Sequence, residues 1–155
     1  MNVERLSKLA NFLRKVPDEN FNLTSWRSTI DSDQDYDEGY QTATNEDLLG
    51  HVCGTTGCAV GWACALPEFN KQGLIWDDYG PLFESNDLVE EWDDATPTYI
   101  GWDAVDKFFD ITLYQSNYLF SDTRYDDNAT PTMVADRIDN FIKDGYEIEI
   151  AKTND

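Results

Sequence analysis

Apolar residues recur at the spacing of an amphipathic helix near both ends of the chain. The first pattern covers residues 3–16 and is followed by Pro17, which cannot continue a helix. The second begins with Thr130 as an N-cap and Pro131 in the first turn, and Gly145 is expected to end it. Its apolar face is expected to contain Met133, Val134, Ile138, Phe141 and Ile142. The pattern therefore predicts one amphipathic helix near each end.

Shorter patterns lie between and beyond these helices. Three segments have the apolar spacing of short helices: residues 88–92, 102–109 and 113–120. Thr112 is expected to cap the last of these, with Leu113, Tyr114, Tyr118 and Leu119 on its buried side. Residues 73–83 predict a strand and a turn, and residues 146–150 alternate like an edge strand. Together these patterns predict an α+β fold, a mostly helical single domain with a small sheet or hairpin.

Residues 51–66, HVCGTTGCAVGWACAL, contain all three cysteines and the only histidine. Small residues around Trp62 predict a short helix that is packed on nearly all sides. In this interpretation Cys58 and Cys64 are small buried apolar residues. Gly61 is then the position at which a neighbouring element approaches the helix most closely.

The entry to this helix also allows functional interpretations. Gly54 permits the positive φ of a turn, and Thr55 or Thr56 is expected to cap a helix that begins near residues 56–57. Cys53 would then lie just before the positive end of the helix, where a thiolate is stabilised, and His51 could act as its base. The first helical amides could alternatively hold an anion. The alternative ligand-binding residues are His51, Cys53, Gly54, Thr55 and Thr56.

Metal and cofactor sites are not favoured by the spacing of these residues. The gaps between His51, Cys53, Cys58 and Cys64 do not include the close pairs that zinc sites use. No cofactor-binding motif is present, so neither a metal nor a cofactor is expected. The odd number of cysteines, with no apolar leader at the start and no long apolar segment, predicts a cytoplasmic protein.

Charge is the strongest compositional signal. The chain has 31 acidic and 11 basic residues, a net charge of −20, while its 21 aromatic residues favour a packed fold over disorder. Direct binding to nucleic acid or to an anionic membrane is disfavoured by this field. Twenty charges match about 34 Å of duplex DNA. Spread evenly, the acids are too sparse to imitate a duplex, but clustered on one face they suggest a DNA mimic that binds a basic partner. The alternative is a solvated acidic surface without a specific partner.

The acidic strip within residues 72–106 is the predicted partner-binding region, because it has no Lys or Arg between its ends and carries aromatic residues among the acids. The partner is expected to be a host protein with a basic surface. The candidate partner-binding residues are Trp76, Asp77, Asp78, Tyr79, Glu90, Glu91, Trp92, Asp93 and Asp94.

Four segments together resemble a family of small uncharacterised proteins from bacteria and their phages: NFNLTSW, CGTTGCAVGWA, FFDITLYQSNYLF and TPTMVADRIDNFI. That family carries Cys-Gly-Thr-x-x-Cys-x-x-Gly-Trp/His-Ala, and its cysteines correspond to Cys53 and Cys58, with Cys64 outside the motif. Residues 31–47 and 77–94 are acidic insertions relative to that pattern. The resemblance implies an origin and no mechanism. Together with the charge it favours a phage-type accessory protein that inhibits a host defence protein, ahead of a small-ligand binder and of a Cys-dependent enzyme.

Overall fold

The computed structural model describes residues 1–29, 43–77, 79–85, 97–126 and 128–144. The helices are α1 (Val3–Leu13), α2 (Asn45–Leu49), α3 (Ala59–Ala63), α4 (Pro67–Lys71), α5 (Trp102–Phe109), α6 (Leu113–Phe120) and α7 (Pro131–Asp144), with 3₁₀ turns η1 (Asp18–Asn20) and η3 (Asp122–Arg124). The strands are β1 (Arg27–Ser28), β2 (Thr56–Gly57), β3 (Leu74–Asp77), β4 (Gly80–Glu84) and β5 (Thr98–Ile100). The predicted α+β, mostly helical fold class is confirmed.

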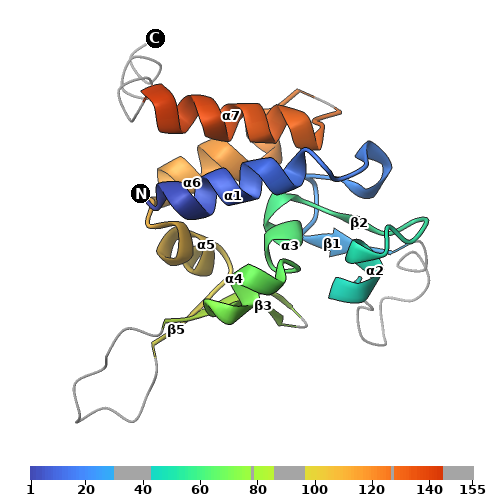
Figure 1. Cartoon of the computed structure of the whole chain (residues 1–155), viewed down its shortest axis with the longest axis horizontal. Coiled ribbons are helices and arrows are strands. Elements are labelled where there is room, and N and C mark those ends of the chain that lie inside the picture. The colour runs from blue at the N-terminus through green and yellow to red at the C-terminus, as the bar shows by residue number, and fades with distance from the viewer. Residues whose placement is uncertain (30–42, 78, 86–96, 127, 145–155) are drawn as a thin grey trace.

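The helices form layers above the larger sheet. Figure 1 shows α7 uppermost, then α1 with α6, then α5 and α3, and the strands β3 to β5 at the lower edge. Helix α1 packs along α7 and also contacts α3 and α5. These elements supply large side chains that are fully buried, among them Leu6, Leu9, Leu13, Trp62, Phe108, Phe109 and Ile138. The core therefore lies around α1, between the last helix and the sheet.

The larger sheet is antiparallel with the strand order β3-β4-β5. Its register pairs Leu74 with Phe83 and Phe83 with Tyr99, and these three residues face the helices. Because successive side chains of a strand alternate between faces, the neighbouring residues point away from the core. The smaller sheet pairs β1 with β2 and attaches the residues before α3 to the rest of the fold.

The central helix is buried as predicted, but it begins later than predicted. All residues of α3 are buried, and the side chain of its N-cap Cys58 accepts a hydrogen bond from the Gly61 amide, with 3.4 Å between Sγ and N. The expected cap by Thr55 or Thr56 is wrong, because Thr56 pairs with Ser28 in the small sheet. The strand pairing uses the residues that a longer helix would have needed.

Two predicted helix faces need correction. In α6, Leu113 and Tyr114 are 54% and 38% exposed, and the buried residues are Ser116, Leu119 and Phe120. The hydroxyl of Ser116 donates to Asp106 on α5, and this contact turns the polar residue inward. In α7, Met133 is exposed, whereas Val134, Ile138 and Phe141 are buried as predicted. The caps by Thr112 and Thr130 are confirmed.

Several expectations fall on residues outside the described ranges. These are the short helix at 88–92, the helix end at Gly145, the edge strand at 146–150 and most of the acidic segment 31–47. The described end of that segment contains the start of α2, and the described part of 77–94 contains the turn from β3 to β4 and the strand β4. Among the described residues, no helix is both long enough and apolar enough to span a membrane.

Gly61 provides a direct test of the packing around α3. A Cβ atom placed on Gly61 would lie 2.0 Å from the backbone oxygen of Trp26. We expect Gly61→Ala to lower the free energy of unfolding by about 2 kcal/mol or more, because the backbone of residue 26 would have to move. The matched control is Gly50→Ala at the exposed end of α2, where φ is −80° and an added Cβ would lie 3.0 Å from the nearest atom, the backbone oxygen of Glu46. Urea unfolding should show a much smaller loss for the control, and a tolerated Gly61→Ala would contradict the close approach.

Candidate functional site

The residues of the alternative ligand site lie on the loop between α2 and β2. His51 and Cys53 are exposed, and Gly54 has the expected positive φ of 82°. Helix α3 begins at Ala59, six residues beyond Cys53, so the premise that Cys53 lies at the positive end of a helix is wrong. The effect of a helix dipole is confined to the first turn, and it therefore supplies no activation to this thiol.

The other residues of this loop are used in the fold. Thr55 is buried, and its carbonyl accepts a hydrogen bond from Asn20 Nδ2 at 2.8 Å. The hydroxyls of Thr56 and Ser28 are hydrogen-bonded to each other at 2.6 Å. The amide of Cys58 donates to the backbone oxygen of Trp26. The amides of Thr55 and Cys58 and the hydroxyl of Thr56 thus have partners within the protein, which counts against the predicted anion site.

The two remaining cysteines are inert thiols inside the core. Burial raises the pKa of Cys58 to about 11 and that of Cys64 to about 12. Both thiols are therefore neutral near pH 7. The free energy of unfolding falls as the pH rises from the ordinary thiol pKa near 9 towards the raised values, because only the unfolded chain ionises in that interval. In the part of the chain that the structure describes, His, Cys, Asp and Glu form no group of three or more suited to a metal ion.

Arg27 brings a positive charge into the centre of this region. The side chain is 4% exposed, and its Nε and Nη2 both donate to the carbonyl of Gly61, at 3.1 and 2.8 Å. Nη1 donates to the carbonyl of Ala43 at 3.2 Å, and Nη2 also donates to Asn45 Oδ1 at 2.6 Å. The guanidinium lies 4.3 Å from the centre of the Trp76 ring. Desolvation by burial lowers its pKa to about 10.

Sequence reasoning did not single out Arg27, although one signal was present. It is the only Lys or Arg between Lys15 and Lys71. An isolated base in such an acidic stretch indicates either a functional cation or a structural one. The contacts assign Arg27 the structural role, because its donors bind backbone and amide oxygens of the fold.

The structure describes three of the predicted partner-binding residues. Asp77 and Tyr79 lie at the turn between β3 and β4, and Tyr79 is 88% exposed. The side chain of Trp76 points to the face of the sheet opposite to that of Asp77, where it packs on Arg27. It is only partly exposed, so it is poorly positioned to anchor an interface. The remaining candidates fall outside the described residues: Asp78, Glu90, Glu91, Trp92, Asp93 and Asp94.

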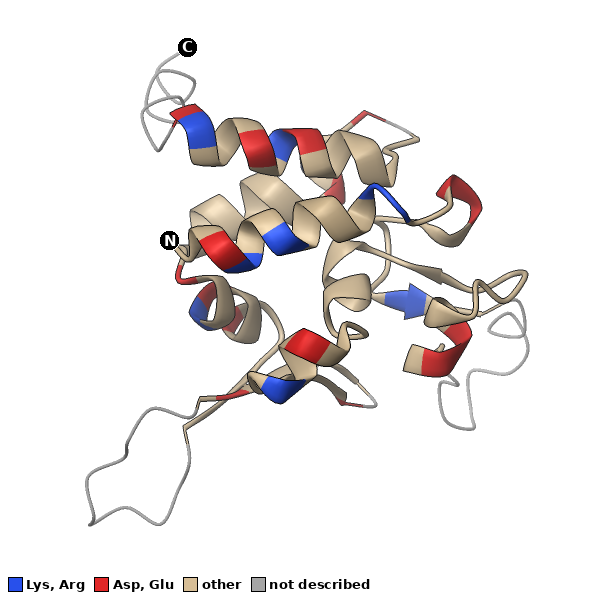
Figure 2. Cartoon of the chain, viewed as in Figure 1, with Lys and Arg blue, Asp and Glu red and all other residues tan. Residues whose placement is uncertain are grey.

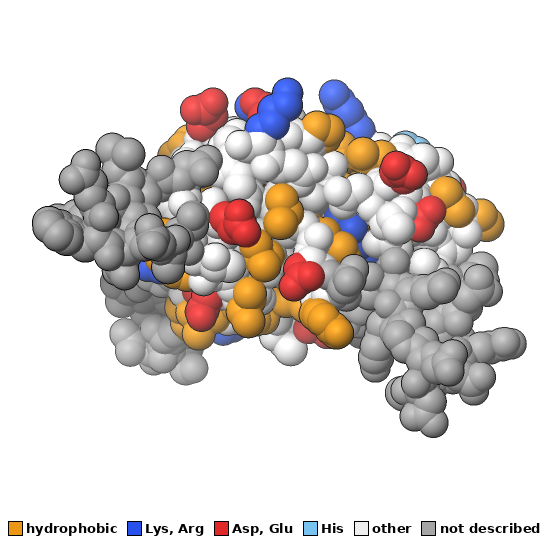
Figure 3. Space-filling view, turned by 90° about the horizontal axis from the view of Figure 1, so that it is seen from below, with side chains coloured by type: hydrophobic (Ala, Val, Ile, Leu, Met, Phe, Trp, Pro, Cys, Tyr) orange, Lys and Arg blue, Asp and Glu red, His pale blue; other side chains and the backbone are white. Residues whose placement is uncertain are grey.

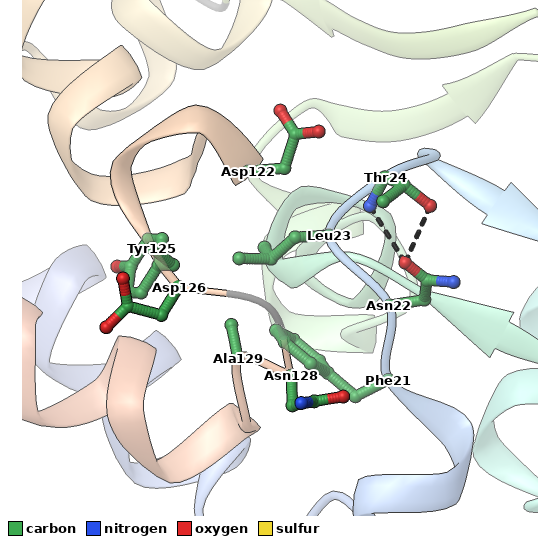
Figure 4. Close-up of a pocket in the computed structure, with 9 residues that line it drawn as sticks. All are labelled: Phe21, Asn22, Leu23, Thr24, Asp122, Tyr125, Asp126, Asn128 and Ala129. Carbon is green, nitrogen blue, oxygen red and sulfur yellow. Dashed lines mark hydrogen bonds between the residues drawn. The ribbon is translucent and has the colours of Figure 1, made fainter.

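A cavity of about 310 Å³ lies between the segment that precedes β1 and the connection from η3 to α7. Figure 4 shows Leu23 extending toward Tyr125 and Asp126 from the opposite wall. The hydroxyl of Tyr125 donates to the carbonyl of Leu119 at 2.5 Å, and Asp122 adds a second carboxylate to the lining. Sequence reasoning predicted none of the residues that line it. Its described lining combines the two carboxylates with neutral polar and apolar side chains and contains no Lys or Arg, and the Tyr125 hydroxyl already has a partner.

Comparison with protein-family models, curated proteins and solved structures gave no match. The resemblance based on the Cys-Gly-Thr motif therefore stays a prediction.

Arg27 allows a sharp test of the buried cation. We expect Arg27→Lys to lower the free energy of unfolding by about 2–4 kcal/mol, because a single ammonium cannot replace the forked donors to three acceptors. Arg14→Lys is the matched control, since Arg14 is more exposed and pairs with Asp136 and Asp139 at the surface. Its cost should stay below about 1 kcal/mol. Equal losses in urea unfolding would show that Arg27 does not organise the fold.

The thiols can be tested by alkylation at pH 8 followed by mass spectrometry. We expect iodoacetamide to label Cys53 in the folded protein, because this side chain is exposed. Cys58 and Cys64 should be labelled only after unfolding, because burial excludes the reagent and raises both pKa values. Rapid labelling of Cys58 in the folded state would show that the thiol is accessible and would contradict the structural assignment.

Proposed function

We propose that this protein is an acidic binding protein that occupies the basic, nucleic-acid-handling surface of a partner protein. In its biological setting we propose a phage-type inhibitor of a host defence protein. The observation that carries the proposal is the unequal use of the two signs of charge. Most of the described cations make contacts within the protein, some of them at its surface, whereas the acidic residues are in excess.

The cations take part in several kinds of internal contact. Arg5 donates to the carbonyl of Phe108, and Arg137 donates to two backbone carbonyls. Lys8 pairs with a carboxylate, as Arg14 does. Of the ten described Lys and Arg residues, seven make such bonds or lie over aromatic rings: Arg5, Lys8, Arg14, Arg27, Lys107, Arg124 and Arg137. The acidic residues outnumber the basic ones by 31 to 11 in the whole chain, so the net field stays strongly negative.

The acidic charge is unevenly distributed along the sequence. The described residues contain 16 of the 31 acidic residues and ten of the 11 basic ones. Figure 2 shows both signs mixed over the described helices. The other 15 acidic residues, with only one basic residue, fall in residues 30–42, 78, 86–96, 127 and 145–155. Most of the net charge belongs to these parts of the sequence, and residues 86–96 contain five of the predicted partner-binding acids and aromatics.

An aromatic anchor is required because charge attraction alone is diffuse and easily screened by salt. Tyr79 is suited to this role: its side chain is 88% exposed at the turn that follows β3. Tyrosine is enriched among the residues that dominate binding energy at protein interfaces. Tyr79 thus replaces Trp76 as the described aromatic of the proposed interface.

The experiment is a pull-down from bacterial lysate in a salt series, with duplex DNA as competitor. We expect captured nucleic-acid-binding proteins to be released by DNA and by rising salt. Reversal of Glu90, Glu91, Asp93 and Asp94 to Lys should abolish capture. The control reverses four acids elsewhere, Asp18, Glu19, Glu46 and Asp144, and so makes the same change in net charge.

The control variant separates a specific site from a general charge effect. If both variants lose binding equally, the acidic strip is not the site. If duplex DNA fails to compete at low salt, the partner surface is not a nucleic-acid-binding surface. Circular dichroism should confirm that both variants keep the helical content of the parent.

A further inference from the structure

The outer face of the larger sheet carries a continuous apolar row. The register places Ile75 opposite Leu82, and Leu82 opposite Ile100, so that each strand contributes one member. These residues alternate with Leu74, Phe83 and Tyr99, which face the helices. Ile100 is 67% exposed and Ile75 is 37% exposed. The row therefore lies on the side of the sheet that the described helices leave open.

Carboxylates flank this row on both sides along the strand direction. Asp77 lies two residues after Ile75 on β3, and Glu84 lies two residues after Leu82 on β4. Because the two strands are antiparallel, these carboxylates lie on opposite sides of the row, each about 7 Å from it along its strand. Figure 3 shows the molecule from below, and on the described part of this surface hydrophobic side chains lie among acidic ones.

Charge decides between the possible occupants of this face. A second copy would bring a chain of the same net charge of −20 against the row. Carboxylates beside both rows would then repel one another as the apolar residues approached. A partner with positive side chains would instead be attracted at both sides of the row. The face is therefore complementary to a basic partner and unfavourable for self-association.

We infer that the outer face of the sheet docks an extended basic segment of a partner protein, in which one apolar side chain lies between two Lys or Arg side chains at alternate positions. In an extended segment, residues two apart share a face and are separated by about 7 Å. Their cations then reach Asp77 and Glu84 while the apolar side chain between them covers Leu82 at the centre of the row, between Ile75 and Ile100. This inference deepens and rests on the proposed function, since it specifies the partner chemistry for the sheet region.

The test uses a cyclic β-hairpin peptide with Lys-Thr-Ile-Thr-Lys on one strand, titrated into the ¹⁵N-labelled full chain. One control peptide has Ser in place of Ile, and a second has Glu in place of both Lys. We expect amide shifts to change mainly in residues 74–77, 82–84 and 98–101. Binding of the first peptide should be about fivefold or more tighter than that of either control, which corresponds to about 1 kcal/mol.

Two protein variants test whether the apolar row carries the interaction. Ile100→Ser should weaken binding of the first peptide about fivefold, because the apolar contact is lost. Leu113→Ser is the matched control, since Leu113 is a 54% exposed residue on α6. It should leave binding unchanged. Both positions are exposed, so the melting temperatures should stay close to that of the parent.

Three results would overturn the inference: equal binding of the Ile and Ser peptides, shifts centred outside the sheet, or concentration-dependent dimerisation that Ile100→Ser abolishes. The peptide titration does not depend on the lysate experiment. Peptide binding at the sheet without capture of any nucleic-acid-binding protein would count against the proposed function and support this face. If Ile100→Ser still captures nucleic-acid-binding proteins from the lysate, and the peptide causes no amide shifts, the proposed function is supported and this inference is overturned.

Discussion

The guanidinium of Arg27 is a buried cation on which four separate parts of the chain converge. Arg27 belongs to β1, and its guanidinium donates to the carbonyl of Gly61 in α3. The same group donates to Ala43 and Asn45 at the start of α2 and lies over the ring of Trp76 in β3. Removing such a group from water is costly, and carbonyl and amide oxygens offset the cost only in a defined geometry. The strongly negative field of the whole chain also favours a positive charge inside it.

The parts of the fold that sequence predicts well are those determined by short-range chemistry. Helices α5, α6 and α7 follow apolar periodicity. The caps of α6 and α7 need only a threonine hydroxyl that accepts a hydrogen bond from the backbone amide three residues later. The face of α6 is determined differently. Ser116 turns inward because Asp106 on the neighbouring helix accepts its hydroxyl, and no periodicity within residues 113–120 contains that partner.

The candidate site shows the same division. A four-residue strand such as β3 has large apolar side chains on both faces, so alternation alone does not decide which face turns inward. Its pairing with β4 and the contact with Arg27 place Trp76 inside and leave Ile75 outside. Likewise, the pairing of Thr56 with Ser28 delays the start of α3 and removes the predicted helix end from Cys53. Both outcomes depend on residues distant in sequence.

The packing of α1 along α7 has a consequence for how the chain acquires its structure. More than a hundred residues separate these helices, so on a ribosome α1 emerges about ten seconds before its partner exists. During this interval the apolar stripe of α1 can contact only the intervening segments, chaperones or other chains. Completion of the core therefore awaits α7, and α1 cannot reach its final packing until α7 has been synthesised.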